Sequence, residues 1–270
     1  MPGVLVIGVD GVRFDALGEQ ATPSIRGLGR AGFLTPVPVD DVTPTWSGPC
    51  WATIATGVTV AEHAIVANDF TGHRLAEFPD FLSVATKAGR STFLAVSGWP
   101  PLATTRDGGP LFAEVTRREF LALPPGGHRD PARWGDNDEN VATLAERVLS
   151  GDPAPDVSFV YLGAVDITGH ELGAGSEYRT AVMTMDQRVG RLVAAVRARA
   201  DGADWTTIVV TDHGHLDAGG HGGREPEVVT AWAAAAGPAI RPGARPVITR
   251  HTHIAPLVFA AAGVRWPVTG

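Results

Sequence analysis

The sequence predicts an α/β protein, a three-layer α/β/α sandwich with a largely parallel central sheet. Short apolar runs alternate along the chain with segments of helical periodicity, which is the pattern of parallel strands joined by crossover helices. Three of these runs stop at an aspartate: VLVIGVD at Asp10, FVYLGAVD at Asp166 and TIVVTDHG at Asp212. Because ligands bind at the carboxyl ends of the strands in such a sheet, we expect the three aspartates to converge on one site.

Each further element is supported by its own pattern. Between Tyr178 and Ala200, apolar residues recur at steps of three and four, which predicts an amphipathic helix. The segment WSGPCWATIATG predicts another helix, with Pro49 in its first turn and Gly57 at its end. Additional helices are predicted within 15–32, 82–89, 139–149 and 253–263, and an additional buried strand begins at Ser91.

The length and composition fit one globular domain. The chain has 270 residues, of which 44% are hydrophobic and 19% are charged, so it can bury a sizeable core and is not expected to be disordered. We interpret residues 1–270 as a single catalytic domain. From Trp99 to Asp138 the chain is rich in Pro, Gly, Arg and Asp and has little periodicity. A stretch of this length predicts a lid or specificity insertion over 99–138.

Charge and targeting signals narrow the classes of partner. A formal net charge of −7 argues against a nucleic-acid groove, although bound cations would still permit a phosphate substrate. No apolar run approaches the ~20 residues of a membrane span, and no basic leader precedes the first strand. We therefore expect a cytoplasmic location and no membrane partner. The single cysteine, Cys50, excludes an internal disulfide, and the oligomeric state stays open.

Histidines near the aspartates indicate a metal site. Asp166 and His170 are close enough in sequence to share one ion across a turn, while Asp212 and His213 are adjacent. Asp and His side chains together bind zinc and related transition metals. Each aspartate alone could be a turn or capping residue, but their joint pattern favours ligands. Two divalent ions about 3.5–4 Å apart would clamp the attacking and leaving oxygens of an in-line displacement.

A hydroxyl in the segment TPTWSGPCW is a candidate nucleophile. Ser47 would lie at a helix N-terminus, where free backbone N–H groups favour a phosphate. A metal-bound serine alkoxide needs no histidine base. Thr45 lies in the same turn and is the alternative that the residues alone leave open.

The motifs together resemble the alkaline phosphatase superfamily, in particular its branch of nucleotide pyrophosphatases/phosphodiesterases and phosphonoacetate hydrolase. The resemblance covers nearly the whole chain and rests on five segments in the family's order. They are GVDGVR, PTWSGPCWATIATGVTVAEHAI, DITGHELG, VVTDHG and GGHGG. Any one of these segments is weak evidence, but five in the correct order are specific.

The resemblance implies a role for each matching residue. One zinc would be held by Asp166, His170 and His221, and the other by Asp10, Asp212 and His213. Ser47 would be the nucleophile and would also contact the metal. His215 is a nearby rival to His221, and we favour His221 because it stands in the G-x-H-G segment.

This chain departs from the family at Cys50, which replaces an Asn that helps to hold the phosphoryl oxygen. Asn68 is a candidate to supply that contact. Trp51 and Trp99, with Trp46 and Phe70, either pack in the core or form a wall for a flat group of the substrate. We list Asn68, Trp51 and Trp99 as candidate substrate contacts.

The resemblance thus implies a two-metal phosphohydrolase that cleaves a phosphodiester, pyrophosphate or phosphonate bond through a covalent Ser47 intermediate. Its cofactors would be two divalent ions, most simply Zn²⁺, with Mn²⁺ or Fe as alternatives. Its substrate would be a small phosphorylated metabolite or a nucleotide. The alternatives are a phosphomonoesterase of the same superfamily and a non-catalytic relative that binds metal and nucleotide. A sulfatase is disfavoured because Cys50 is followed by Trp51 and Ala52, without the C-x-P-x-R segment of that branch.

Overall fold

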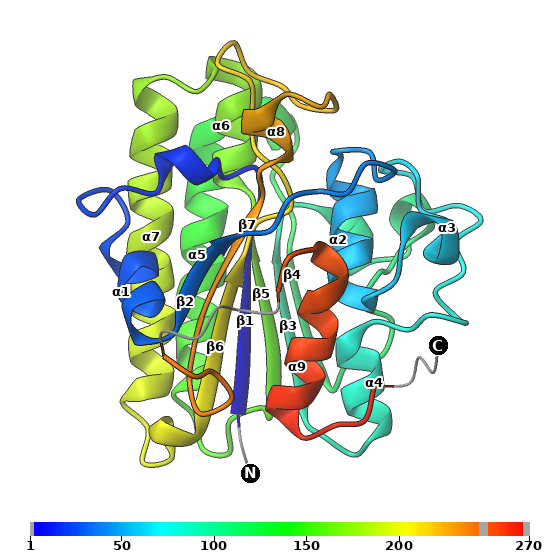
Figure 1. Ribbon diagram of the computed structural model, residues 1–270, viewed down its shortest axis with the longest axis vertical. Helices are drawn as coiled ribbons and strands as arrows, with labels where there is room; N and C mark the ends of the chain where they lie inside the picture. The colour runs from blue at the N-terminus through cyan, green and yellow to red at the C-terminus, as the bar shows by residue number, and fades with distance from the viewer. Residues whose placement is uncertain (1–2, 243–247, 267–270) are drawn as a thin grey trace.

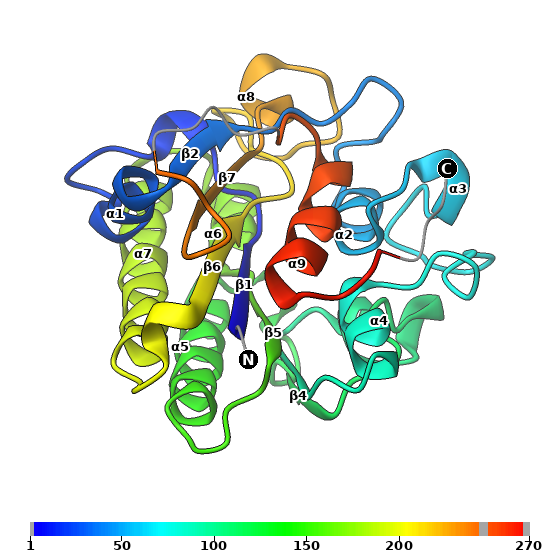
Figure 2. The ribbon, with the colours of Figure 1, turned by 60° about the horizontal axis from the view of Figure 1, so that its bottom comes forward.

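A seven-stranded, mostly parallel sheet forms the centre of the protein in the computed structural model, which describes residues 3–242 and 248–266 (Figures 1 and 2). The strand order is β2-β7-β6-β1-β5-β3-β4. Strand β7 runs antiparallel to its neighbours β6 and β2, and the remaining pairs are parallel. The strands are β1 (Gly3–Val9), β2 (Phe33–Pro36), β3 (Thr92–Ser97), β4 (Arg117–Leu121), β5 (Val157–Leu162), β6 (Trp205–Val210) and β7 (Trp232–Ala236).

Helices cover both faces of the sheet and make the three layers, as Figure 1 shows. On one side lie α1 (Pro23–Ala31), α5 (Pro131–Leu149), α6 (Ala164–Leu172) and α7 (Ser176–Arg197). On the other side lie α2 (Ser47–Thr56), α3 (Val60–His63), α4 (Phe81–Lys87) and α9 (Ile254–Ala262), while α8 (Pro226–Val229) lies near the end of the sheet that carries α6. Within the described residues, 3₁₀ turns lie at Phe14–Ala16, Pro100–Leu102, Arg106–Gly108, Gly127–Arg129, Gly202–Asp204 and His251–His253. The predicted three-layer α/β fold is therefore confirmed.

Strand β1 shows how the sequence builds two cores at once. Leu5 and Ile7 pack into the cluster that includes α5 and α7, whereas Val4 and Val6 pack into the cluster that includes α2 and α9. Every residue of β1 is buried, as expected for a strand covered on both faces. Gly8 leaves room for the Trp51 ring, because a Cβ at this position would lie 2.7 Å from it. This close contact brings α2 against the end of β1.

The helix that carries Asp166 begins earlier than the sequence suggests. Strand β5 ends at Leu162, and Asp166 lies in the first turn of α6 and not at a strand end. The helical position of Asp166 suits a shared site with His170, because a helix places residues four apart on the same face. Asp166 and His170 therefore point in one direction from α6.

The segment 99–138 differs from the prediction of an irregular lid. Residues 117–121 form the edge strand β4, and α5 begins at Pro131, eight residues before the expected start. Asp130 caps this helix by accepting hydrogen bonds from the backbone N–H groups of Ala132 and Arg133. Leu111 and Phe112 are buried in the core, so much of this stretch is part of the sandwich.

Besides β4, the sequence patterns do not predict the strands β2 and β7. β2 is only four residues long and ends at a proline, and four of the five residues of β7 are alanine. Alanine and proline are both depleted in strands, which hides these segments from propensity arguments. Among the described residues, no helix combines the length and apolar character needed to cross a bilayer.

Candidate metal centre and nucleophile

The three predicted aspartates come together at one edge of the sheet. Asp10 directly follows β1, and Asp212 lies two residues beyond the end of β6. Asp166 stands four residues beyond the end of β5. Because β6, β1 and β5 are neighbours in the centre of the sheet, their carboxyl ends bring these side chains to the same place.

His213 and two carboxylates form the first cluster. The Nδ1 atom of His213 lies 3.1 Å from the Gly214 carbonyl oxygen, so Nδ1 carries the proton and donates there. The Nε2 lone pair then faces Oδ2 of Asp212 at 3.1 Å and Oδ1 of Asp10 at 3.7 Å. All three side chains are at most 1% exposed.

The other oxygens of these carboxylates are fully engaged. Asp10 Oδ2 accepts hydrogen bonds from the Tyr161 hydroxyl at 2.6 Å and from Trp51 Nε1 at 2.8 Å. Asp212 Oδ1 accepts from the backbone N–H groups of Gly11 and His213. In contrast, Asp10 Oδ1 and Asp212 Oδ2 are buried and accept no hydrogen bond from the part of the chain that the structure describes. Two unsatisfied carboxylate oxygens beside an imidazole lone pair fit a bound cation.

Burial of so much charge shifts the pKa values of this cluster. Burial raises the pKa of Asp10 and of Asp212 well above the usual range of a carboxyl, and repulsion from the neighbouring carboxylates raises both further. Burial also holds the pKa of His213 well below its usual value, which keeps the ring neutral. A divalent cation would reverse the penalty on the carboxylates and would bind the neutral imidazole.

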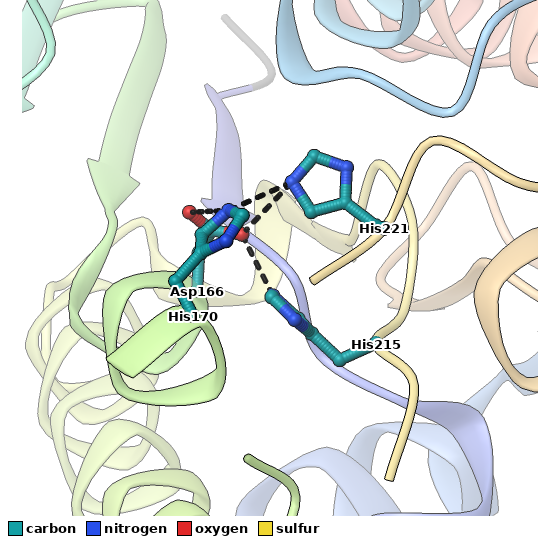
Figure 3. Close-up of side chains that lie close together, drawn as sticks. All are labelled: Asp166, His170, His215 and His221. Carbon is teal, nitrogen blue, oxygen red and sulfur yellow. Dashed lines mark hydrogen bonds and ion pairs between the residues drawn. The ribbon is translucent and has the colours of Figure 1, made fainter. Parts of the chain in front are cut away.

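The second cluster surrounds Asp166 (Figure 3). Its members are Asp166, His170, His215 and His221, whose ligand atoms all lie within 4.8 Å of one another. Nε2 of His170 lies 3.6 Å from Asp166 Oδ2, and Nε2 of His221 lies 3.6 Å from Asp166 Oδ1. The two Nε2 atoms are 2.9 Å apart.

His221 is oriented by the loop that precedes the candidate nucleophile. Its Nδ1 atom donates a hydrogen bond to the Thr45 carbonyl oxygen at 2.6 Å, which leaves the Nε2 lone pair free to face Asp166. Burial lowers the pKa of His221 to about 4, so the ring is neutral at pH 7. Metal-bound histidines use this same arrangement, with one nitrogen toward the metal and the other donating to an oxygen.

His215 is the member of this cluster that sequence reasoning underrated. The sequence presents His215 as an alternative to His221 as a metal ligand, but the structure brings both rings to Asp166. His215 Nε2 lies 2.8 Å from Asp166 Oδ1, and the side chain is fully buried. A Cβ on Gly11 or on Gly169 would come within 2.8 Å of the His215 ring, so two glycines make space for it. The available signal was its position two residues after His213 in DHGH.

Ser47, and not Thr45, faces the first cluster. Ser47 is the first residue of α2, and its Oγ lies 3.3 Å from His213 Nε2. The hydroxyl of Thr45 instead donates a hydrogen bond to the Gly223 carbonyl oxygen at 2.9 Å, and the Thr45 side chain is fully buried. The sequence alone did not decide which of the two hydroxyls is the candidate nucleophile, and this geometry favours Ser47.

Asn68 lies beside the start of α2, and Cys50 is buried within that helix. Asn68 Oδ1 accepts a hydrogen bond from the Gly48 N–H at 2.7 Å, which leaves its Nδ2 hydrogens without a partner among the described residues. The thiol of Cys50 points at the Pro44 carbonyl oxygen, 3.4 Å away, and is buried. Cys50 offers no amide donor, and Asn68 is placed at the start of α2 to supply one.

The three tryptophans considered as substrate contacts or core residues, Trp46, Trp51 and Trp99, differ in their exposure. Trp51 is 1% exposed and its Nε1 donates to Asp10, so its ring has little surface to offer to a substrate. Trp99 is half-buried and packs against Phe70 and Tyr161. Trp46, which directly precedes Ser47, is 43% exposed. Of these rings, Trp46 is the most accessible to a ligand.

Comparison with known proteins identifies the family. Residues 4–228 match the family described as type I phosphodiesterase / nucleotide pyrophosphatase. An uncharacterized pyrophosphatase/phosphodiesterase of Schizosaccharomyces pombe is 25% identical over 231 residues, covering 78% of this chain and 44% of that protein. The chain thus spans less than half the length of this curated relative.

Solved structures share the fold at low sequence identity. Murine ectonucleotide pyrophosphatase / phosphodiesterase 5, an inactive variant in complex with AMP, superposes with a TM-score of 0.72 at 17% identity, over 100% of this chain and 97% of that chain. A phosphonate monoester hydrolase of Agrobacterium radiobacter gives a TM-score of 0.72 at 16% identity, over 98% of this chain and 74% of that chain. Since the family match covers most of its length, this chain belongs to the type I phosphodiesterase / nucleotide pyrophosphatase family.

Proposed function

We propose that this protein is a two-metal phosphohydrolase that cleaves a phosphodiester, pyrophosphate or phosphonate bond through a covalent intermediate on Ser47. One observation carries the proposal. Ser47 Oγ lies 3.3 Å from His213 Nε2, and that nitrogen also faces the two buried, unpartnered oxygens of Asp10 and Asp212. A hydroxyl at this point would share a cation with three ligands.

The residues fit two divalent ions. Asp166, His170 and His221 would hold one ion, and Asp10, Asp212 and His213 would hold the other together with Ser47. Carboxylate oxygens and neutral imidazoles suit Zn²⁺, and also Mn²⁺ or Fe. When bound, the ions would stabilise negative charge on the attacking, leaving and non-bridging oxygens of the phosphoryl group.

The protein itself would position the reaction. Ser47 Oγ would lose its proton to solvent and attack phosphorus, so that the Oγ–P bond forms while the bond from phosphorus to the leaving oxygen breaks. The leaving oxygen would take up a proton from solvent. Water would then attack the same phosphorus and lose a proton, the Oγ–P bond would break, and protonation of Oγ would regenerate the Ser47 hydroxyl. Asn68 Nδ2 and the Ser47 backbone N–H, at the start of α2, are available to donate to a non-bridging oxygen.

His215 would act through Asp166. A hydrogen bond from His215 Nε2 to Asp166 Oδ1 fixes the direction of the carboxylate. Burial alone would raise the pKa of Asp166, but the bond from His215 and the surrounding imidazoles together lower it. A carboxylate that stays ionised and oriented is a better metal ligand.

The relatives support small phosphorylated substrates. The murine protein of the same fold was captured with AMP, and the curated relative is a pyrophosphatase/phosphodiesterase. We propose a nucleotide or another small phosphorylated metabolite as the substrate of this chain. In the phosphomonoesterase alternative, a monoester would be turned over faster than a diester.

The test compares Ser47→Ala with the control Ser150→Ala, an exposed serine at the end of α5. Turnover is followed by p-nitrophenol release from a phosphonate, a nucleotide diester and a monoester, and metal content is measured on the same samples. We expect Ser47→Ala to lose at least about 10³-fold in kcat with its metals retained, as for other lost nucleophiles. Equal activity in this variant would contradict the covalent mechanism. Nucleotide binding without turnover in the unaltered protein would favour a non-catalytic relative.

A further inference from the structure

Two exposed apolar side chains, Trp46 and Val66, lie in the segments that carry Ser47 and Asn68. The large hydrophobic residues that are exposed, among those described, are Val42 at 72%, Trp46 at 43%, Val66 at 60%, Leu172 at 54% and Met183 at 46%. Trp46 directly precedes Ser47, and Val66 lies two residues before Asn68. Leu172 lies two residues after His170 on α6, which places it on another face of that helix. Single exposed hydrophobics are ordinary, but a group at the mouth of a site is typical of ligand binding.

Contacts between the segments bring Val66 and Trp46 to the same end of α2. The segment 66–68 packs on the start of α2, because Asn68 Oδ1 accepts the Gly48 N–H and a Cβ on Gly48 would lie 2.2 Å from the Ala67 carbonyl oxygen. The end of α6 meets the loop of His221 through His170, as Figure 3 shows. In Figure 1, α6, the start of α2 and the loop that leads into α8 lie at the same end of the sheet.

Gly222 leaves space for the Trp46 side chain. Gly222 follows His221 and has a φ of +109°, and a Cβ at this position would lie 2.6 Å from Trp46 Nε1. A glycine is therefore needed both for the backbone conformation and for the approach of the indole. The ring is thus fixed next to Ser47 while part of its surface remains open to a ligand.

The arginines that contact these loops are already engaged. Arg13 pairs with Asp15 and Asp217, and Arg129 pairs with Glu171. Arg224 donates to the carbonyl oxygens of Val39, Asp40 and Thr43 and also pairs with Asp41. Recognition of a second phosphate calls for charge-assisted hydrogen bonds, usually from arginine or lysine. These three guanidinium groups are held by protein partners instead.

We propose that Trp46 and Val66 form an apolar rim that selects phosphorus esters carrying an uncharged apolar group over substrates with a second phosphate. This inference rests on the proposed function and names the substrate class for the same site. Trp46 would be the main specificity-determining residue, because an aromatic ring offers the largest rigid contact area.

A competing hypothesis comes from a separate cavity. Thr104, Arg106 and His128 line a space of about 530 Å³ near the ends of β3 and β4. Arg106 is exposed, and could bind a distal phosphate if the substrate extends that far. The Arg106→Ala variant therefore belongs in the test.

The first measurement compares three substrates on the unaltered, metal-loaded protein. p-Nitrophenyl phenylphosphonate and p-nitrophenyl methylphosphonate share a leaving group and differ only in the apolar group, and ATP carries additional phosphates. We expect kcat/KM to be about tenfold higher for the phenyl than for the methyl compound, and lower again for ATP. If the protein turns over both phosphonates equally well, the proposed rim is wrong but the proposed function stands. The same conclusion follows if ATP is preferred and Arg106→Ala removes that preference. No turnover of any substrate would overturn the proposed function, and the rim with it.

The second measurement uses rim variants. Trp46→Ala should lower kcat/KM for the phenyl compound about tenfold, which is about 1.4 kcal/mol, and leave the methyl compound within about twofold. Trp46→Phe should restore most of the preference, and Val66→Ser should reduce it. Met183→Ala is the control, because Met183 is 46% exposed on α7, away from the proposed ligands. An equal loss on both compounds in Trp46→Ala would show that Trp46 only positions Ser47, and would overturn the proposal.

Discussion

Nε2 of His170 lies 2.9 Å from Nε2 of His221, although the two residues are 51 positions apart in the chain. The Nδ1 atom of His221 donates to the Thr45 carbonyl oxygen, so its Nε2 has a lone pair that faces His170. Two imidazole nitrogens this close, beside the carboxylate of Asp166, are donors of the kind that transition metals bind. The hydrogen bond to Thr45 also links these proposed ligands to the loop of the proposed nucleophile, because Thr45 precedes Ser47 by two residues.

Replacing His170 should remove one metal ion and leave the other. His170→Ala removes one of the three proposed ligands of the ion at Asp166. The proposed ligands of the other ion, Asp10, Asp212 and His213, are unchanged. We expect about one divalent ion per chain in place of about two, measured by mass spectrometry of the metals. His128→Ala, an exposed histidine remote in sequence, is the control and should keep both ions. Unchanged metal content in His170→Ala would exclude His170 as a ligand.

Replacing His215 should weaken metal binding without abolishing it. His215→Ala removes the hydrogen bond to Asp166 Oδ1, and losses of such outer partners cost about 10–100-fold in metal affinity. His215→Gln should recover part of the affinity, because its amide can donate to the same oxygen. Affinity is measured by competition with a chelator. The visible spectrum of the Co²⁺-loaded protein reports on ligand geometry and should change in His215→Ala. The same affinity and spectrum in His215→Ala would contradict the positioning role.

Replacing Asn68 should slow the chemical step and not metal binding. Asn68→Ala removes an amide that is held by the Gly48 N–H and directed at the start of α2. Loss of one donor to a developing negative charge costs about 10²–10³-fold in kcat. Asn140→Ala, an exposed position on α5, serves as the matched control. If kcat is unchanged in Asn68→Ala, another group must hold the phosphoryl oxygen.

His63 should make folding stability depend on pH. Its Nδ1 accepts the Ile65 N–H, its Nε2 faces the Thr53 hydroxyl, and burial lowers its pKa from 6.5 to about 4. Between pH 6.5 and about pH 4, His63 is protonated in the unfolded chain but stays neutral in the folded chain. Stability from His63 is therefore complete above pH 6.5 and falls by up to about 1.4 kcal/mol per unit as the pH drops toward 4.

Denaturant unfolding between pH 4 and pH 7.5 measures this effect. The free energy of unfolding should depend less steeply on pH in His63→Gln than in the unaltered protein. His128→Gln, which changes an exposed ring, should keep the original slope. Parallel slopes for His63→Gln and the unaltered protein would contradict the assignment.

The sequence was sufficient for the fold class and for the meeting of the aspartates. Apolar runs that stop at Asp10 and at Asp212 mark the ends of neighbouring strands, so sheet topology alone brings them together. The helix that begins at Ser47 was predicted from Pro49 and Gly57, and Gly57 does end it in a left-handed conformation. These features depend on local patterns that the sequence displays directly.

Other features depend on partners far away in the chain. Nothing local shows that His215 would pack between Gly11 and Gly169, or that Trp51 would turn inward to donate to Asp10. The choice between Thr45 and Ser47 depends on which hydroxyl meets Gly223 and which meets His213. Such contacts are set by tertiary packing, which a single sequence does not reveal.

The central claim is that the aspartates and histidines at the sheet edge hold two metal ions. The most direct measurement is the metal content per chain of the purified protein and of Asp212→Ala. We predict about two divalent ions in the former, and a joint loss of metal and of p-nitrophenyl ester turnover in the latter. A protein that binds no divalent ion after incubation with Zn²⁺, Mn²⁺ or Fe²⁺, or an Asp212→Ala variant that keeps both ions, would contradict the claim.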